Sequence, residues 1–175
     1  MSRATMTSTA IAVVVSISSA SPALARIDGD LLVKPSTRSV KDSIDALAAA
    51  VEAAGAKVVA RVDHAAGAKA VGAEMKPAEV LIFGNPKLGT PLMQANPRAG
   101  LDLPLKVLAY EDAKGKVWIV TTRAAALRSR YGIKGKDEVI TAMTGALDKL
   151  TGAAAGAAMT PAPMPAITPT APAKK

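Results

Sequence analysis

Residues 78–104 read AEVLIFGNPKLGTPLMQANPRAGLDLP, and they combine the most apolar strand of the chain with its densest set of Gly, Pro and Asn residues. The unbroken apolar run Val80 to Phe83 is typical of a central strand that is covered on both faces. Gly84, Asn85 and Pro86 then end the strand, because they supply a φ-permissive residue, a turn former and a residue without a backbone donor. A loop in this position is a common place for a binding site.

Two amphipathic helices are predicted on either side of this stretch. Ser39 is a good N-cap with Asp42 three residues later, and Gly55 is placed to end the first helix. Asp137 and Glu138 open the last helix. Each helix has one apolar stripe, so each is expected to pack on one side against a sheet. The stripes comprise Val40, Ile44, Leu47, Val51 and Ala54 in the first helix, and Val139, Ile140, Met143, Leu147 and Leu150 in the last.

The remaining segments predict five strands with short helical turns between them. In residues 57–63 the apolar residues alternate, which places Val58, Ala60 and Val62 on one face. Asp63 is expected to cap an Ala-rich turn, and Thr90 to cap a short helix that begins at Pro91. The order strand, helix, four strands, helix predicts an α+β fold, an antiparallel sheet with two helices packed on one face. The strands are expected at residues 31–33, 57–63, 78–83, 105–111 and 116–122.

The first 25 residues have the three parts of a secretory signal peptide. Arg3 supplies the amino-terminal charge, residues 10–17 a short apolar segment, and residues 23–25 (ALA) a cleavage site. About eight apolar residues are too few to span a bilayer, which takes about 20. We therefore expect cleavage after Ala25, a periplasmic or secreted protein, and no transmembrane segment in the mature form.

Residues 27–151 are expected to form a single domain, and residues 152–175, rich in Ala and Pro, a disordered tail. The formal charge of the chain is +8, and removal of Arg3 lowers it by one. Export makes a nucleic-acid partner unexpected, so the basic cluster is interpreted as a solvated face, with a specific anion site as the alternative. The cluster comprises Arg123, Arg128, Arg130, Lys134 and Lys136.

Several chemistries lack the residues that they need. The chain has no cysteine, so disulfides, thiolate chemistry and lipoprotein acylation are excluded. It has one histidine, so a zinc site of the usual ligands is not expected, and we predict no metal and no cofactor. No serine lies in a G-x-S-x-G elbow. Residues 84–90 (GNPKLGT) have the outline of a phosphate loop but lack the lysine after the second glycine. No catalytic residue is assigned.

Three ordered motifs carry a resemblance over about residues 31–145: D-H-A at residues 63–65, P-x-E-x-x-x-F-G-N-P at 77–86 and L-D-L-P-L at 101–105. With them the chain resembles the uncharacterised domain of unknown function family 302. The resemblance implies a fold like that of the TATA-binding protein, in the order β-α-β4-α, and frequently a homodimer. It implies no activity. By motif match, the positions of interest are Asp63, His64, Glu79, Gly84, Asn85, Pro86, Asp102 and Pro104.

Two functions remain open after these exclusions. The first is a non-catalytic envelope module that binds a small ligand or a partner, and the loop backbone with Lys87 and Thr90 could hold a small anion there. The second is a small enzyme with an acid–base site at Asp63 and His64 or at Glu79. The candidate ligand-binding residues are Asp63, His64, Glu79, Asn85, Lys87, Thr90 and Asp102.

Overall fold

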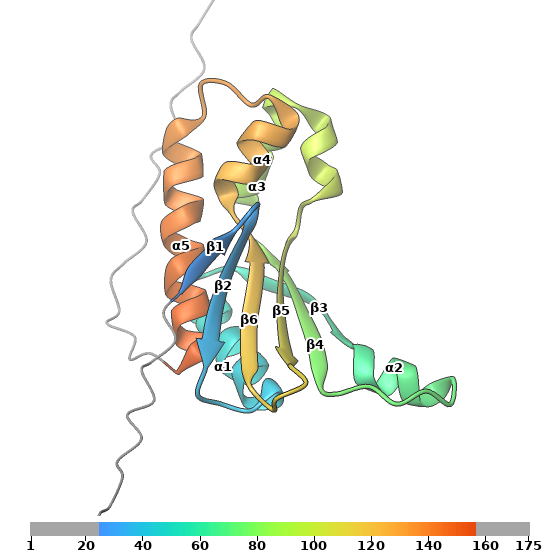
Figure 1. Ribbon diagram of the computed structural model, residues 1–175. Helices are drawn as coiled ribbons and strands as arrows, with labels where there is room; N and C mark the ends of the chain where they lie inside the picture. Colours follow the sequence, from blue (N-terminus) through green and yellow to red (C-terminus); the bar gives the residue numbers. More distant parts are fainter. Residues whose placement is uncertain (1–24, 157–175) are drawn as a thin grey trace, which may run out of the picture.

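A computed structural model of the protein describes residues 25–156 (Figure 1). Its strands form one six-stranded antiparallel sheet in the order β1-β2-β6-β5-β4-β3. The expected α+β class is therefore confirmed. The strands are β1 (Arg26–Asp28), β2 (Leu31–Ser36), β3 (Lys57–Asp63), β4 (Ala78–Gly84), β5 (Leu105–Glu111) and β6 (Val117–Thr122).

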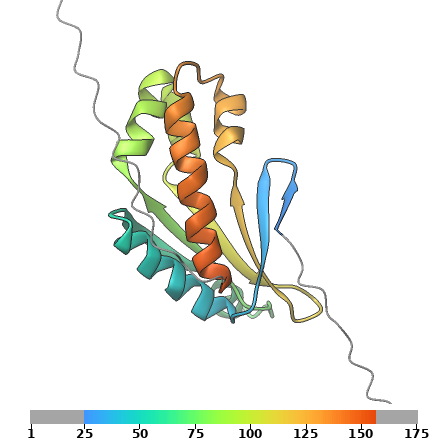
Figure 2. The ribbon, with the colours of Figure 1, turned by 90° about the vertical axis from the view of Figure 1, so that its left-hand side faces the viewer.

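Helices α1 (Val40–Ala53) and α5 (Asp137–Ala155) pack side by side on one face of the sheet (Figure 2). Their apolar stripes and the strand residues that face them form the core of the domain. The shorter helices lie in the connections, as expected for helical turns in the loops. They are α2 (His64–Ala70), α3 (Pro86–Ala95), the 3-10 helix η1 (Pro97–Leu101) and α4 (Ala124–Tyr131).

Helix α1 begins and ends where its sequence predicts. The Ser39 hydroxyl accepts a hydrogen bond from the Asp42 backbone N–H at 3.1 Å and donates one to the Asp42 carboxylate at 2.7 Å. This arrangement satisfies a helix donor that would otherwise have no partner. At the other end Gly55 has a φ of +70°, the left-handed conformation that ends many helices.

Two helix boundaries differ from the expectation. Helix α3 begins at Pro86 with Asn85 as its N-cap, so Thr90 lies inside the helix and caps nothing. Proline is favoured at the first helical position, and in α3 this proline is Pro86 rather than Pro91. Helix α5 continues through Ala155, beyond residue 152 where the tail was expected, because its alanines are good helix formers and pack on the core.

Strand β1 and helix α4 had no counterpart among the expected elements. Strand β1 is three residues long and pairs only with β2, so its sequence carries almost no periodic signal. Helix α4 occupies the basic segment and ends at Gly132, which has a φ of +59°. Its apolar residues are mostly alanines, and only packing against α5 shows which side is buried.

The expected face of strand β3 is wrong at its beginning. The register between β3 and β4 shifts between Val58 and Ala60, so Val58 pairs with Phe83, whereas Ala60 pairs with Ile82. A bulge of this kind inserts one residue and moves the side chains on either side of it to different faces. Val58 packs against the core, and Ala60 and Val62 do not share its face.

The face of the sheet away from α1 and α5 is also apolar. From Val80 in β4, from Val107 in β5 and throughout β6, buried residues alternate with half-buried ones, and the cross-strand pairs place the half-buried residues together on this second face. Figures 1 and 2 show α1 and α5 on the opposite side only. We call this surface the open sheet face; it comprises Val80, Ile82, Leu108, Tyr110, Trp118 and Val120.

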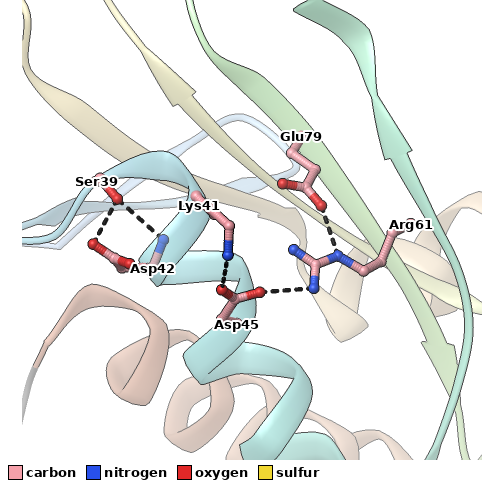
Figure 3. Close-up of polar contacts among 6 residues, drawn as sticks. All are labelled: Ser39, Lys41, Asp42, Asp45, Arg61 and Glu79. Atoms are coloured by element: carbon pink, nitrogen blue, oxygen red, sulfur yellow. Dashed lines mark hydrogen bonds and ion pairs between the residues drawn. The ribbon is translucent and has the colours of Figure 1, made fainter. Parts of the chain in front are cut away.

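An ion-pair chain ties α1 to the edge of the sheet (Figure 3). The Arg61 guanidinium contacts the Asp45 carboxylate of α1 and the Glu79 carboxylate of β4, each at 2.7 Å. Lys41 adds a contact of 2.6 Å to Asp45. The hydrogen bonds from Lys41 and then Arg61 lower the pKa of Asp45. The Glu79 side chain is only 13% exposed, and the Arg61 guanidinium is its ion-pair partner.

The predicted signal peptide and most of the predicted tail lie outside the described residues. No helix within residues 25–156 combines the length and hydrophobicity that a membrane crossing requires.

Two glycines provide a matched test of the backbone conformation. We expect Gly55→Ala to lower the free energy of unfolding by about 1–2 kcal/mol, since a Cβ is unfavourable at positive φ. Gly145→Ala, inside α5, should raise it by about 0.5–1 kcal/mol, since alanine is the better helix former. At neither position would a Cβ meet an atom within 4 Å, so packing does not interfere. Urea unfolding measures both; effects of the same sign would contradict the helix boundaries.

A double-mutant cycle tests the ion pair between Arg61 and Glu79. Arg61→Met leaves the Glu79 carboxylate without its partner and should lower the free energy of unfolding by about 1–3 kcal/mol. Adding Glu79→Gln should restore part of this loss, with a coupling energy of about 1 kcal/mol. Lys41→Met is the control and should change little, because the Lys41 side chain is 77% exposed. Strictly additive effects of the two substitutions, measured by urea unfolding at pH 7, would rule out the coupling.

Candidate functional site

An apolar pocket of about 500 Å³ opens where strand β4 ends, and we call it the GNP pocket after Gly84, Asn85 and Pro86, which form part of its wall. Its other walls come from the end of α1, the start of β3, helix α3, the segment before β5, and the middle of α5. The remaining lining residues are Ala54, Ala56, Lys57, Val59, Phe83, Leu88, Gly89, Thr90, Met93, Leu103, Pro104, Leu105, Met143, Ala146, Leu147 and Leu150.

Close backbone packing shapes the pocket at the end of β4. A Cβ on Gly84 would lie 3.3 Å from Cβ of Pro104, which is tighter than an ordinary contact. Glycine therefore lets the two segments approach each other, and the Leu103–Pro104 peptide bond there is cis. The bulge in β3 contributes Val59, which is 61% exposed at the pocket. Sequence periodicity predicted neither feature.

The start of helix α3 does not offer free donors for an anion. The Asn85 side-chain oxygen accepts from the Lys87 N–H at 3.0 Å, and the Asn85 carbonyl accepts from the N–H groups of Leu88 and Gly89 at 2.9 and 3.0 Å. Pro86 has no N–H group. The expected helix start at Thr90 is wrong, and the N–H groups that an anion site here would use already have partners within the turn.

The pocket wall has few polar side chains. Asn85 and Thr90 line it, as does one charged residue, the exposed Lys57. No aspartate or glutamate is among the lining residues. Lys87 is exposed beside Pro86 but does not line the pocket. The arrangement suits a ligand that is mainly apolar, with any charged group at the Lys57 side.

The other sequence candidates lie elsewhere. Lys57 pairs with Gly84 at one end of the β3–β4 ladder, whereas Asp63 pairs with Glu79 at the other end. Six residues of strand separate the two ends, which corresponds to about 20 Å. Asp63, His64 and Glu79 are therefore near one another but remote from the GNP pocket.

Each of these three residues has a local structural explanation. The Asp63 carboxylate accepts from the Ala66 N–H at 2.9 Å and so caps α2, as expected. Glu79 is held by Arg61. His64 is exposed as the first residue of α2. The carboxylates thus serve a helix end and an ion pair.

Asp102 belongs to a third location, between η1 and α4. Its carboxylate accepts from the Tyr131 hydroxyl at 2.7 Å and from Arg130. Burial raises the pKa of Asp102, but the hydrogen bonds from Tyr131 and Arg130 outweigh it, so the pKa is lowered overall. The same hydrogen bond raises the pKa of Tyr131, with burial adding to the effect. Arg130 also contacts Asp30 at 3.1 Å, so this cluster joins three segments.

Much of the basic segment is engaged in contacts within the domain. Arg128 contacts Asp137 at 2.8 Å, Arg130 contacts Asp30 and Asp102, and Arg123 donates to the Gly29 carbonyl at 2.9 Å. These ion pairs with aspartates partly neutralise the positive charge of the basic segment. Across residues 25–156, no three His, Asp or Glu side chains lie close enough together to hold a metal ion.

The sequence did not predict most of the pocket, because its candidate site residues were chosen among polar side chains and the lining is mostly apolar. Of the seven candidates, Asn85 and Thr90 line the pocket and Lys87 lies beside it. Met143, Leu147 and Leu150 were predicted as an apolar stripe, but a stripe does not indicate whether its neighbours fill the space in front of it. The motif match to Pro104 was a usable signal, since this residue forms part of the wall.

Three curated proteins match this chain closely, and two are described here. The "Fluoride-specific ion channel FluC 1" of Brucella suis biovar 1 (strain 1330) is 42% identical over 136 residues, which cover 77% of this chain and 54% of that protein. The "Fluoride-specific ion channel FluC 1" of Brucella abortus biovar 1 (strain 9-941) is also 42% identical, and the match covers 77% and 50% of the two chains. The chain thus spans about half the length of the curated relatives it matches.

The fold is similar to that in a crystal structure of an uncharacterized conserved DUF302 protein from Bacillus stearothermophilus. The two share a TM-score of 0.65 and 16% sequence identity, over 73% of this chain and 99% of the other. At this identity the likeness concerns the fold alone. A family model described as "Domain of unknown function DUF302" matches residues 32–150, most of the sheet and both long helices. The chain therefore belongs to the DUF302 family of domains of unknown function.

Proposed function

We propose that this domain is a non-catalytic binding module that holds a small, mainly apolar ligand in the GNP pocket. The observation that carries the proposal is the pocket itself. Its volume of about 500 Å³ lies within the range of small-molecule sites, roughly 300–1,000 Å³. Such sites combine apolar walls with a few polar groups, and here those groups are Lys57, Asn85 and Thr90.

The apolar lining of the pocket favours an apolar ligand over the small anion that the sequence suggested. A small anion without an apolar part would find the N–H groups of the Asn85 turn already bonded. An apolar ligand gains from leaving water wherever its surface is covered, at about 25 cal/mol per Å². Burial therefore provides the main driving force, and polar contacts fix the orientation.

The alternative of an acid–base enzyme has less support. Asp63 caps a helix and Glu79 is paired with Arg61, about 20 Å along the strands from the pocket. A general base needs a substrate within hydrogen-bond reach. The engagement of both carboxylates and their distance from the pocket favour binding over catalysis.

We also propose that the module acts in the bacterial cell envelope. The signal-peptide features of residues 1–25 support export. In the curated relatives the matched region is joined to about as much further sequence, which supports its use as a separable module. The chain spans about half of those proteins, so we do not extend the fluoride-channel activity in their names to it.

Filling the pocket tests the proposal. N-phenyl-1-naphthylamine, a neutral fluorophore, should bind the protein saturably with one molecule per subunit. Ala146 is half-buried in the α5 wall, so Ala146→Trp should weaken this binding about tenfold or more, which corresponds to about 1.4 kcal/mol. The matched control is Thr144→Trp on the same helix, which is exposed and does not line the pocket.

Fluorescence titration with each variant gives the result directly, and circular dichroism verifies that both remain folded. Unchanged binding by a folded Ala146→Trp protein would place the fluorophore elsewhere and contradict the proposal. Equal losses in both variants would do the same, because the control leaves the pocket open.

We further propose that two copies pair through the open sheet face. An antiparallel sheet that leaves one face in water normally has polar side chains there, whereas the centre of this face, apart from the exposed Lys106 opposite Ile82, has aliphatic and aromatic ones. Trp118 is flanked by Lys116 and Arg26, at 4.5 and 5.3 Å from the ring centroid. The family resemblance, which implies frequent dimers, points the same way.

The size of the face is compatible with a dimer. Six strands about 4.8 Å apart and about 20 Å long present roughly 600 Å² of flat surface per copy. A stable interface buries about 800 Å² of accessible surface per partner, a measure that exceeds the flat area because side chains protrude. Pairing through this face would cover the half-buried aromatic residues Tyr110 and Trp118.

A charge placed at the centre of the open sheet face should prevent pairing. Leu108 is half-buried on the central strand β5 and lies outside the core, so Leu108→Glu should give a folded monomer. Val71→Glu is the control, since Val71 is 81% exposed and follows α2, away from this face. Sedimentation equilibrium should show a dimer for the original and control proteins. A monomer in all three would reject the pairing.

A further inference from the structure

We infer that the ligand of the GNP pocket is a single-chain amphiphile with an anionic head group, its alkyl chain inside the pocket and its head at Lys57. This inference rests on the proposed binding function and names the ligand class. It follows from three observations: the composition of the walls, the sign of the charge at the mouth, and the engagement of the backbone N–H groups at the start of α3.

The walls suit a flexible alkyl chain. They come from six parts of the fold and present aliphatic side chains, one phenylalanine and two methionines. Met93 is 36% exposed and Met143 is buried, so one lies toward the opening and the other toward the interior. Methionine side chains adapt their shape to a neighbour more readily than branched ones do. A linear chain with many conformers is the kind of ligand that such walls accommodate.

The charge at the mouth is positive. Lys57 lines the pocket at the start of β3, opposite Gly84, and Lys87 lies three residues beyond Gly84. Both lysines are exposed, and neither forms an ion pair within residues 25–156. With no acidic residue in the lining, an anionic head is favoured over a cationic one.

The head group contributes less to the binding free energy than the alkyl chain does. The N–H groups of the Asn85 turn are occupied, so an anion has lysine ammonium groups as its main partners. Exposed charge pairs contribute little and are screened by salt. Affinity must therefore come from the chain, and orientation from the charge. A short carboxylate such as acetate should accordingly bind too weakly to measure.

A homologous series of ligands tests whether the alkyl chain provides the affinity. Octanoate, decanoate and dodecanoate, each kept below its micelle concentration, are compared with the 1-alkanols and alkyltrimethylammonium ions of the same chain length. Competition with N-phenyl-1-naphthylamine gives the dissociation constants. Each added methylene should tighten binding by a factor of up to about four until the pocket is full.

The head group is tested separately with lysine variants. At low salt the carboxylates should bind about threefold to tenfold more tightly than the alkanols, and the ammonium ions more weakly. Lys57→Gln should remove most of the difference between carboxylate and alkanol while leaving alkanol binding unchanged. Lys114→Gln, an exposed lysine in the β5–β6 turn, is the control and should change neither. Salt at 0.5 M should reduce the carboxylate advantage.

The outcomes separate the two proposals. If carboxylates and alkanols bind equally and Lys57→Gln has no effect, the anionic head is rejected while the apolar pocket stands. If ammonium ions bind best, the assigned charge is wrong. If no member of any series competes, and Ala146→Trp leaves the fluorophore bound, both the ligand class and the binding function are rejected.

Discussion

The hydrogen bonds of Asn85 make the turn on which the candidate site depends. Its side chain and its carbonyl together accept from the first three N–H groups of α3, so a buried central strand changes into a helix within two residues. This turn directs α3 away from the sheet and leaves space between the end of α1 and the middle of α5. The same bonds saturate the donors, so the space is apolar and offers no cradle for an anion.

The sheet is apolar on both faces, and each face has a different consequence. Leu81 and Phe83 point to α1 and α5 and belong to the core. Val80 and Ile82, in the same strand, point to the open sheet face, because neighbouring residues of a strand alternate. The unbroken run from Val80 to Phe83 predicts a strand that is covered on both faces. Helices α1 and α5 cover one face, and cover of the other by a second copy is our proposal.

The charged candidates show why residue type alone was a weak guide to function. Asp63, Glu79 and Asp102 each lie in one of the three motifs. Asp63 caps a helix, Glu79 pairs with an arginine, and Asp102 accepts a hydrogen bond from a tyrosine. Glu79 and Asp102 are half-buried and need such partners, since an unpaired charge is costly away from water. The partners of Glu79 and Asp102 lie 18 and 29 residues away along the chain, so sequence spacing does not predict these pairs.

Local spacing and short ordered motifs are enough to predict the fold class, the two long helices with their buried stripes, the cap at Ser39 and the family. The sequence also indicated the end of β4 as the place of interest. Tertiary structure alone decided the pocket, the bulge that turns Val58 to the core, and the helix α4. The physical reason is that a cavity is volume left unfilled by several segments at once. No single segment encodes that volume, since it appears only when α1, α3, α5 and the sheet have packed together.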